Sequence, residues 1–353
     1  MRRHLIVPVV ALVGVLVACV PPDPGPSTTT STTTTSTTTT LPGPTVQQES
    51  LDAAAAWVLG QFDTTGVMPN VWSPEFPDHG NGVLAVANLD ALGVGGATSS
   101  VRYEALLDAK ESYIDEGAGD RPGALARVIM AVVAHGDDPR DVRGSDLVAR
   151  LEATQQPNGL YGTQYAAFDG AFRQGLALAA LSLVSPRPAS IDAGAAWLVD
   201  QQCDDGSWMM YRAATTGDCV ENPAMWQFKD SNGSALAVLG LSAVGVAADV
   251  DPASWFTSVR GDDGGWGTSP AGPTQESDAD STGLVIGALE SLGDPIPTSA
   301  WDALLAFQGV NDAVPANQGA YAWKLTLPEP NRLATMDAMV ALFDEVWPAA
   351  LAG

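Results

Sequence analysis

The chain has 353 residues, of which 41 are acidic and 16 are basic, so its formal net charge at pH 7 is −25. This acidic balance argues against nucleic acid or anionic lipid as a partner, since both attract basic surfaces. Once an N-terminal export segment is set aside, about 300 residues remain, which is enough for one large hydrophobic core.

The first residues of the chain are typical of an export signal. Two arginines precede an apolar run of 13 residues, from Leu5 to Val17, which has the length of a signal-peptide core and is short for a membrane span. The run ends in Leu-Val-Ala-Cys19, which resembles the lipobox of bacterial lipoproteins. By that resemblance residues 1–18 are a signal peptide and Cys19 is lipidated. The alternative is an ordinary signal peptide cut nearby, with Cys19 discarded.

The segment that follows the cysteine, through residue 46, is almost entirely Pro, Ser, Thr and Gly. Such a composition cannot bury apolar surface, so the segment stays extended. We expect residues 19–46 to form a stalk, a candidate for O-glycosylation, that holds the domain of residues 47–350 away from the outer face of the cell membrane.

The rest of the chain alternates between two kinds of helical segment. One kind is amphipathic and Ala-rich, and ends in turn residues such as Asp-Asp-Gly. The other kind is apolar on nearly all sides and must be buried, and several copies end in a glycine suited to a left-handed cap. Amphipathic outer helices are expected near residues 50–62, 102–113, 146–156, 190–202, 252–259 and 299–308. Apolar inner helices are expected near residues 83–93, 124–136, 175–184, 234–245, 282–293 and 334–343.

A short repeat closes the outer segments. Trp197, Gln201, Gly206 and Trp208 form one copy, which recurs as Trp255, Val259, Gly264 and Trp266. Further copies are Trp57, Gln61 and Gly66, and Leu151, Gln155, Gly159 and Tyr161. Helical pairs of this kind either stack as an open solenoid or close into a ring. The ends of the array have no evident polar cap, which favours closure.

The repeat of Gln201, Gly206 and Trp208 resembles that of the prenyltransferase and squalene cyclase superfamily. The resemblance implies an all-α fold, the α6/α6 toroid or α/α barrel, of six helical hairpins over residues 47–350. In that superfamily the repeat ties outer helices together, so it indicates the fold and not the chemistry. Members include terpene cyclases, protein prenyltransferase subunits and the secreted cobalamin carriers transcobalamin and intrinsic factor, to which this chain is closest in character.

The starts of the inner helices are expected to share one rim of the ring. Candidate site residues there are Asp78, His79, Asp230, Glu276, Asp278 and Asp280. Asp278-Ala-Asp280 is similar to the Asp-x-Asp-Asp motif of class II terpene cyclases, whose middle Asp protonates an alkene, but Ser281 replaces the last Asp. The other interpretation is helix capping, since Asp and Asn accept the free N–H groups of a first turn, and we favour it because it explains three such helix starts at once.

Cys203 and Cys219 are an even pair in an exported chain, and we expect a disulfide between them, which contributes roughly 3 kcal/mol. The disulfide would staple the long insertion of residues 209–229, which carries Tyr211 and Trp226. These two aromatic residues, with Trp323, are candidates for ligand binding because long loops on a rigid scaffold often recognise ligands.

No cofactor or metal is expected. Of the three histidines, His4 lies in the signal and His135 at a helix end, which leaves only His79 on the rim. Four aspartates in the Asp-Asp-Gly turns, Asp204, Asp205, Asp262 and Asp263, suit either a calcium ion or a plain surface turn, and we favour the turn.

Three functions remain open. The first is a monomeric, non-catalytic module that binds a small-molecule or cell-surface ligand. The second is a terpene cyclase or prenyltransferase-like enzyme that uses Asp278 and Asp280. A deep apolar cavity around Asp280 would favour this function. The third is a glycan-active toroid with paired carboxylates among Asp230, Glu276 and Asp278, which an open, Trp-lined cleft between two carboxylates would favour. A plugged ring centre would favour the first function.

Overall fold

The computed structural model describes residues 44–115, 117, 119–162, 170–210, 219–225 and 227–352. The expected signal peptide, Cys19 and most of the expected stalk lie outside these residues. Residues 40–353 belong to one compact unit. Within the described part of the chain, every helix is too short or too polar to cross a membrane.

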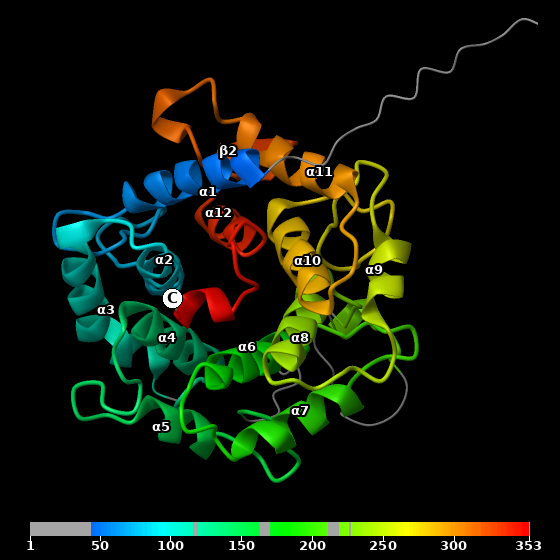
Figure 1. The fold of residues 1–353 in the computed structure, drawn as a ribbon, viewed down its shortest axis with the longest axis horizontal. Coiled ribbons are helices and arrows are strands. Elements are labelled where there is room, and N and C mark those ends of the chain that lie inside the picture. Colours follow the sequence, from blue (N-terminus) through cyan, green and yellow to red (C-terminus); the bar gives the residue numbers. More distant parts are fainter. Residues whose placement is uncertain are drawn as a thin grey trace, which may run out of the picture. The chain divides into compact units, whose positions relative to one another are not determined.

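The described helices form two concentric rings (Figure 1). The inner ring consists of α2 (His79–Ala91), α4 (Pro122–His135), α6 (Ala171–Ser182), α8 (Ser231–Ala243), α10 (Ala279–Leu292) and α12 (Arg332–Met339). The outer ring consists of α1 (Pro44–Leu59), α3 (Ser99–Ile114), α5 (Leu147–Ala153), α7 (Ser190–Asp200), α9 (Pro252–Val259) and α11 (Thr298–Gly309). Each inner helix contacts the next, and α12 returns to α2. The predicted α6/α6 toroid is therefore confirmed.

Small residues bring the inner helices into backbone contact, as on α6 and α8. A Cβ atom on Gly175 would lie 2.1 Å from the Leu236 carbonyl oxygen, and one on Gly240 would lie 2.5 Å from that of Gly175. No side chain separates the two helices at these positions. The Gly- and Ala-rich composition of the apolar segments is thus a packing requirement of the ring.

The glycine of the repeat fits the turn against the start of the next outer helix. Gly206 has φ +92°, and a Cβ atom there would lie 2.7 Å from the Asp251 carbonyl oxygen. Gly319 has φ +88°, and its Cβ would lie 2.0 Å from the Ala53 carbonyl oxygen. Both the left-handed backbone and the close approach therefore require glycine. The same combination occurs at Gly66, Gly159 and Gly264.

The glutamine of the repeat is Gln202, and the assignment to Gln201 was wrong. Gln202 Nε2 donates to the carbonyl oxygens of Gly206 at 3.1 Å and Val250 at 2.7 Å. Gln155, four residues before its own glycine, makes the equivalent bonds to Gly159 and Ser190. The side chain of Gln201, one residue earlier, donates to Asp200 at 3.2 Å.

The ring closes through a fifth copy of the repeat, in the last helical pair, which the spacing in the sequence conceals. Gln308 Nε2 donates to the carbonyl oxygens of Ser50 and Gly319, both at 3.0 Å, and Gln308 Oε1 accepts from the Ser50 hydroxyl at 2.7 Å. The hydroxyl groups of Tyr321 and Ser50 lie 2.6 Å apart. Gln308 precedes Gly319 by eleven residues and not four, because an insertion separates them. The last outer helix is thereby joined to the first.

Two features depart from the expected pattern near the C-terminus. A two-stranded antiparallel hairpin, β1 (Ala322–Lys324) and β2 (Leu327–Pro330), precedes α12. The last inner helix ends at Met339, four residues earlier than expected, because the chain then turns into the ring and buries Leu342 and Trp347.

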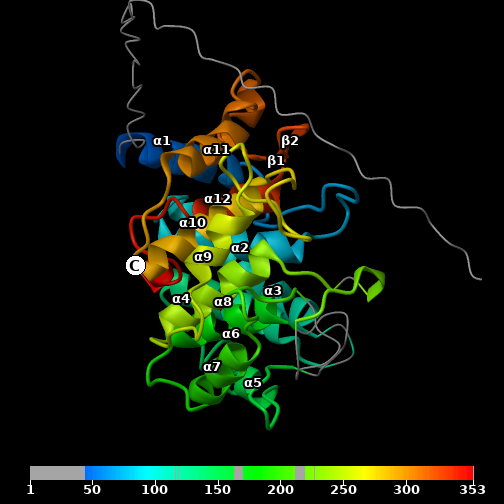
Figure 2. The same cartoon turned by 90° about the vertical axis from the view of Figure 1, so that its right-hand side faces the viewer.

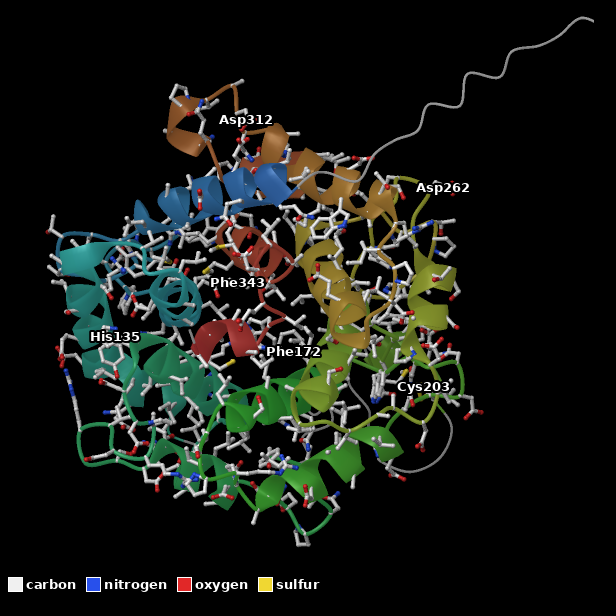
Figure 3. The ribbon with its side chains drawn as sticks, in the orientation of Figure 1. His135, Phe172, Cys203, Asp262, Asp312 and Phe343 are labelled. Carbon is white, nitrogen blue, oxygen red and sulfur yellow. A yellow bond between two sulfur atoms is a disulfide. The ribbon has the colours of Figure 1, made fainter. Side chains whose placement is uncertain are left out.

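The C-terminal segment occupies the ring at the end where the inner helices finish. Its 3-10 helix, η4 (Ala349–Ala352), contacts α2 and α4, and Figure 3 shows Phe343 inside the ring together with Phe172. Residues 346–349 lie over Ser182, Ser242 and Ser291 at the C-terminal ends of α6, α8 and α10. Figure 2 shows this segment on the side of the ring away from the blue loop between α1 and α2. The opposite rim, where the inner helices begin, is not covered by this segment.

Candidate functional site

A cavity of about 1030 Å³ opens at the rim where the inner helices begin, and we call it the ring mouth. Its walls come from the starts of α2, α8, α10 and α12, and from the segments that precede α2 and α12. The side chains that matter most are Trp57, Trp72, Trp323, Asn70, Asn81, Asn232, Asn317, Asn331, Arg332, Asp78 and Asp280. The lining is mixed, with aromatic rings, amides and a few charges.

Three of the expected acidic residues are helix N-caps, as predicted. The carboxylates of Asp78, Asp230 and Asp278 accept hydrogen bonds from the backbone N–H groups of Asn81, Gly233 and Ser281, at 3.3, 2.5 and 2.8 Å. Asp230 and Asp278 are fully buried, and burial raises the pKa of both carboxyls. Thr268 joins them, because its N–H donates to Asp278 at 3.0 Å and its hydroxyl to Asp230 at 3.1 Å. These two carboxyls hold the rim together and do not line the mouth.

Asp280 differs from its neighbour Asp278. It lies in the first turn of α10, not at the cap, and its side chain lines the mouth. Its Oδ1 atom is buried and has no hydrogen-bond partner among the described residues. Burial, followed by the charges of Asp337 and Asp278, raises the pKa of Asp280 well above its ordinary value. Asp280 is therefore placed to act as a neutral hydrogen-bond donor or acid.

Asp337, on α12, is the second acidic group inside the ring. Burial raises the pKa of its carboxyl to about 7, against the opposing attraction of Arg127 on α4, and the charge of Asp278 adds to the rise. The charge of Asp337 raises the pKa of Asp280, because two carboxylates close together in a poorly solvated site resist ionising at the same time.

Glu276 and His79 lie on the same rim but do not line the mouth. The Thr326 hydroxyl donates to Glu276, and Lys324 Nζ lies 3.8 Å from its carboxylate, so Glu276 anchors the hairpin. His79 Nε2 lies 3.3 Å from the Ser112 hydroxyl, on the side of α2 that faces α3. Burial lowers the pKa of His79.

The aromatic candidates divide into three groups. Trp72 is 91% exposed at the edge of the mouth, and Trp323 lines it beside Lys324, whose Nζ lies 4.7 Å from the indole centroid. Trp208 and Trp266 are buried, and each donates its Nε1–H at 2.8 Å to a carbonyl of the preceding outer helix, which confirms their structural role. Tyr211 and Trp226 lie outside the described residues.

Sequence reasoning missed the contribution of α12 to the mouth. Arg332 Nε donates to Gln61 Oε1 at 3.2 Å, and its guanidinium also donates to the Pro69 carbonyl and lies 3.7 Å from Asp78. Asn331 caps α12, in the position that Asp278 holds on α10. An Asn at this position could have predicted the start of α12 from the sequence. The inserted hairpin hides it, because it changes the spacing of the last repeat.

The predicted disulfide between Cys203 and Cys219 is present, with Cα atoms 5.6 Å apart. The aspartates considered for calcium belong to turns. Asp205 accepts from Lys229 at 2.5 Å, and Asp263 accepts from the Ser277 hydroxyl at 2.7 Å. Within the described ranges no three His, Cys, Asp or Glu side chains are grouped to hold a metal ion.

Comparison by sequence finds no matching protein family and no matching curated protein. Comparison of structures does find relatives of the fold. The type II terpene cyclase MstE from Scytonema matches with a TM-score of 0.58 and 14% identity, covering 85% of this chain and 98% of that one. An alpha-amylase from Clostridium perfringens matches with a TM-score of 0.56 and 12% identity, covering 83% and 97%.

A glycosidase variant matches with a TM-score of 0.53 and 13% identity, covering 86% of this chain and 97% of that one. The same toroid thus carries terpene cyclisation in one of these proteins and glycoside chemistry in others. At such identities the likeness establishes the fold alone, so the function has to be argued from the mouth itself.

Proposed function

We propose that this chain is an exported lipoprotein whose toroid binds a glycan in the ring mouth. The observation that supports it best is the lining, which places the indole rings of Trp57, Trp72 and Trp323 around a cavity rich in amide side chains. Flat aromatic faces stack on the apolar faces of sugar rings, and amides match the alternating donors and acceptors of sugar hydroxyls.

Two buried oxygen atoms at the mouth lack partners. Asn232 Oδ1 and Asp280 Oδ1 accept no hydrogen bond from any residue that the structure describes. A buried polar atom without a partner costs about 1–3 kcal/mol. Both residues line the mouth, so a rotation of either side chain would present its oxygen to the hydroxyl group of a ligand, and a hydrocarbon ligand offers no donor.

The same lining argues against a terpene cyclase. Cyclisation of a polyprenyl chain needs a dry apolar pocket around a very strong acid. Asp278 instead accepts two backbone hydrogen bonds, and Ser281 stands where the cyclase motif has its last carboxylate. We therefore place a glycan ahead of a prenyl substrate.

Binding is tested by thermal shift and calorimetry on the exported chain, with oligosaccharides, prenyl alcohols and corrinoids as separate panels. An oligosaccharide should raise the melting temperature. Trp72→Ala should weaken its binding roughly tenfold, about 1.4 kcal/mol, and Trp72→Phe should weaken it less, since a ring remains. Leu292→Ala, an exposed apolar residue at the far end of α10 and outside the lining, is the control. A shift by prenyl compounds or corrinoids alone would overturn the proposal.

Display at the membrane is tested separately. Cys19→Ala should move the protein from the membrane fraction to the soluble exported fraction, and should abolish incorporation of an alkyne-labelled fatty acid. If the Cys19→Ala protein stays in the membrane fraction without incorporating the fatty acid, a lipid on Cys19 is not what anchors the chain.

Glycoside hydrolysis is a second candidate, and the raised pKa of Asp280 favours it. The acidic residues of the mouth lining are Asp280 on α10 and Asp78 on α2, on either side of the start of α12. In such a reaction Asp280 would protonate the glycosidic oxygen, and Asp78 would stabilise the sugar cation or activate water. Asp280→Asn should then abolish turnover and retain binding. If the wild-type chain binds an oligosaccharide and does not cleave it, hydrolysis is excluded and only the binding function remains.

A further inference from the structure

A second cavity lies beneath the loop that joins α1 to α2. It has a volume of about 270 Å³ and is enclosed by this loop, α2 and α3. Its lining is mainly apolar, with Phe62, Met68, Val83, Val86, Leu106 and Tyr113 as the large side chains. We call this cavity the apolar slot. None of the proposed roles of the ring mouth uses it.

Three charged groups along the apolar slot already have partners. Asp63 accepts from the Thr65 N–H at 2.8 Å, Arg102 lies 3.5 Å from Asp90, and Lys110 Nζ lies 3.3 Å from Glu111. The pKa of His79 is lowered, mainly by burial, which favours its neutral form. Glu75, which also belongs to the lining, is exposed to solvent. The rest of the slot offers mainly apolar surface, and this surface selects an uncharged apolar group.

The slot and the ring mouth adjoin. Pro69, Pro74 and Asp78 line both cavities, from the loop between α1 and α2. The same loop exposes Val71, Trp72 and Phe76 to solvent, at 59%, 91% and 63%. One ligand can therefore touch the polar mouth with one end and the slot with the other.

We propose that the apolar slot takes the hydrocarbon tail of an amphiphilic glycan whose sugar occupies the ring mouth. This inference rests on the proposed function and narrows it to glycosides that carry an alkyl or aryl group. The sugar meets the amides and indole rings of the mouth, and the tail passes the shared wall at Pro69 and Pro74 to reach the side chains between α2 and α3.

The test compares methyl and octyl β-maltoside, and methyl and octyl β-glucoside, by calorimetry on the exported chain below the micelle concentration of each. The octyl compound of a sugar that binds should bind about tenfold or more tightly than the methyl compound, because its tail is removed from water.

Two substitutions fill the slot. Gly82→Leu directs a side chain toward Met68, whose Cβ would lie 3.7 Å from the new Cβ, and Ala105→Phe fills it from α3. Each should remove the octyl advantage and leave methyl glycoside binding unchanged. Ala196→Phe, on an exposed position of α7, is the matched control and should retain the advantage. Should both filled variants melt early, Leu106→Ala replaces them, and its larger slot should favour a decyl tail over an octyl tail.

The outcomes separate the two proposals. Equal binding of methyl and octyl glycosides would overturn the tail site and leave glycan binding intact. An octyl advantage that persists in the filled variants would also overturn it, because the tail would then lie elsewhere, such as on Trp72. If no glycoside or other oligosaccharide binds, the proposed function fails and the tail site fails with it.

Discussion

Asp278 and Asp280 are two residues apart in sequence, and their surroundings make them chemically different. Both oxygens of Asp278 accept backbone N–H groups, and the residue is fully buried. Asp280 faces the ring mouth with an unpaired oxygen. Helix geometry accounts for the difference, because an N-cap side chain folds back on its own first turn, whereas a residue two positions later projects inward.

Asp278→Ala should lower the free energy of unfolding by about 2 kcal/mol or more, since it leaves the N–H groups of Ser281 and Thr268 without an acceptor. Asp280→Ala removes an unpaired buried oxygen and should leave stability unchanged or increase it. Urea unfolding of the two variants at neutral pH measures the difference. Equal losses would contradict the separate roles.

Asp337 should make the protein less stable as the pH rises. Its pKa in the folded state is about 7, against an ordinary value of 3.8, so between these values the folded state holds the proton more firmly than the unfolded state. Stability from this group is therefore fully present below about pH 4 and is lost as the pH rises through about 7.

Asp337→Asn should remove this loss. At pH 8 the free energy of unfolding of the variant should exceed that of the wild type by about 1–2 kcal/mol, a figure reduced for partial solvent access to the carboxyl. At pH 4 the two free energies should be equal. Urea titrations at both pH values give the comparison. Stability curves that run parallel across this range would show that Asp337 ionises normally.

At the scale of the elements, the turn between an outer and an inner helix is the unit that repeats. Its glycine fits against the next outer helix, its glutamine bonds across to that helix, and its aromatic residue is held by the next inner helix. Trp208, Trp266 and Tyr321 each donate a backbone N–H to a hydroxyl there, on Ser234, Thr282 and Thr335. The turn therefore joins three helices at once.

Gly319→Ala should be far more destabilising than a glycine substitution in an open turn. Both Gly319 and Gly245 have positive φ, at +88° and +76°, but a Cβ atom on Gly245 meets nothing within 4 Å. Gly245→Ala should cost about 1–2 kcal/mol from backbone strain alone. Gly319→Ala adds a clash with the Ala53 carbonyl and should cost at least about 2 kcal/mol more. Thermal unfolding distinguishes them, and equal shifts would exclude the close approach.

At the scale of the whole molecule, the described helices form a closed ring whose first and last outer helices are joined. Gln308, Ser50 and Tyr321 make this seam, across more than 250 positions of sequence. An open array would leave one face of each terminal repeat without a neighbour. In the closed ring every repeat has two neighbours.

Closure should make unfolding a single cooperative transition. Calorimetric and van't Hoff enthalpies should agree, and Gln308→Ala should lower the melting temperature without splitting the transition. Gln202→Ala, which removes the equivalent bonds within the ring, is the matched control and should give a similar shift. A separate early transition for α1 and α11, seen by hydrogen exchange, would contradict closure.

The local sequence pattern was sufficient to predict most of the helices of the fold. Most helix bounds fall within a few residues of those expected, and α9 matches at both ends. Hydrophobic periodicity, caps and glycine stops are local properties, which explains this agreement. Two predictions were wrong, the choice of Gln201 over Gln202 and the end of α12. Both depend on contacts with segments distant in sequence, and spacing alone cannot show which segment makes the contact.

The amino-acid sequence by itself determined that the chain forms six helical pairs, that their apolar members lie inside, and that aspartates cap three of the inner helices, since each follows from residues within a turn or two of one another. Only the tertiary structure decided where the ring closes, which end the C-terminal segment fills, why Asp280 and Asp337 resist ionising, and that a polar mouth adjoins an apolar slot. The physical reason is that desolvation, charge coupling and cavities depend on groups that only folding brings together.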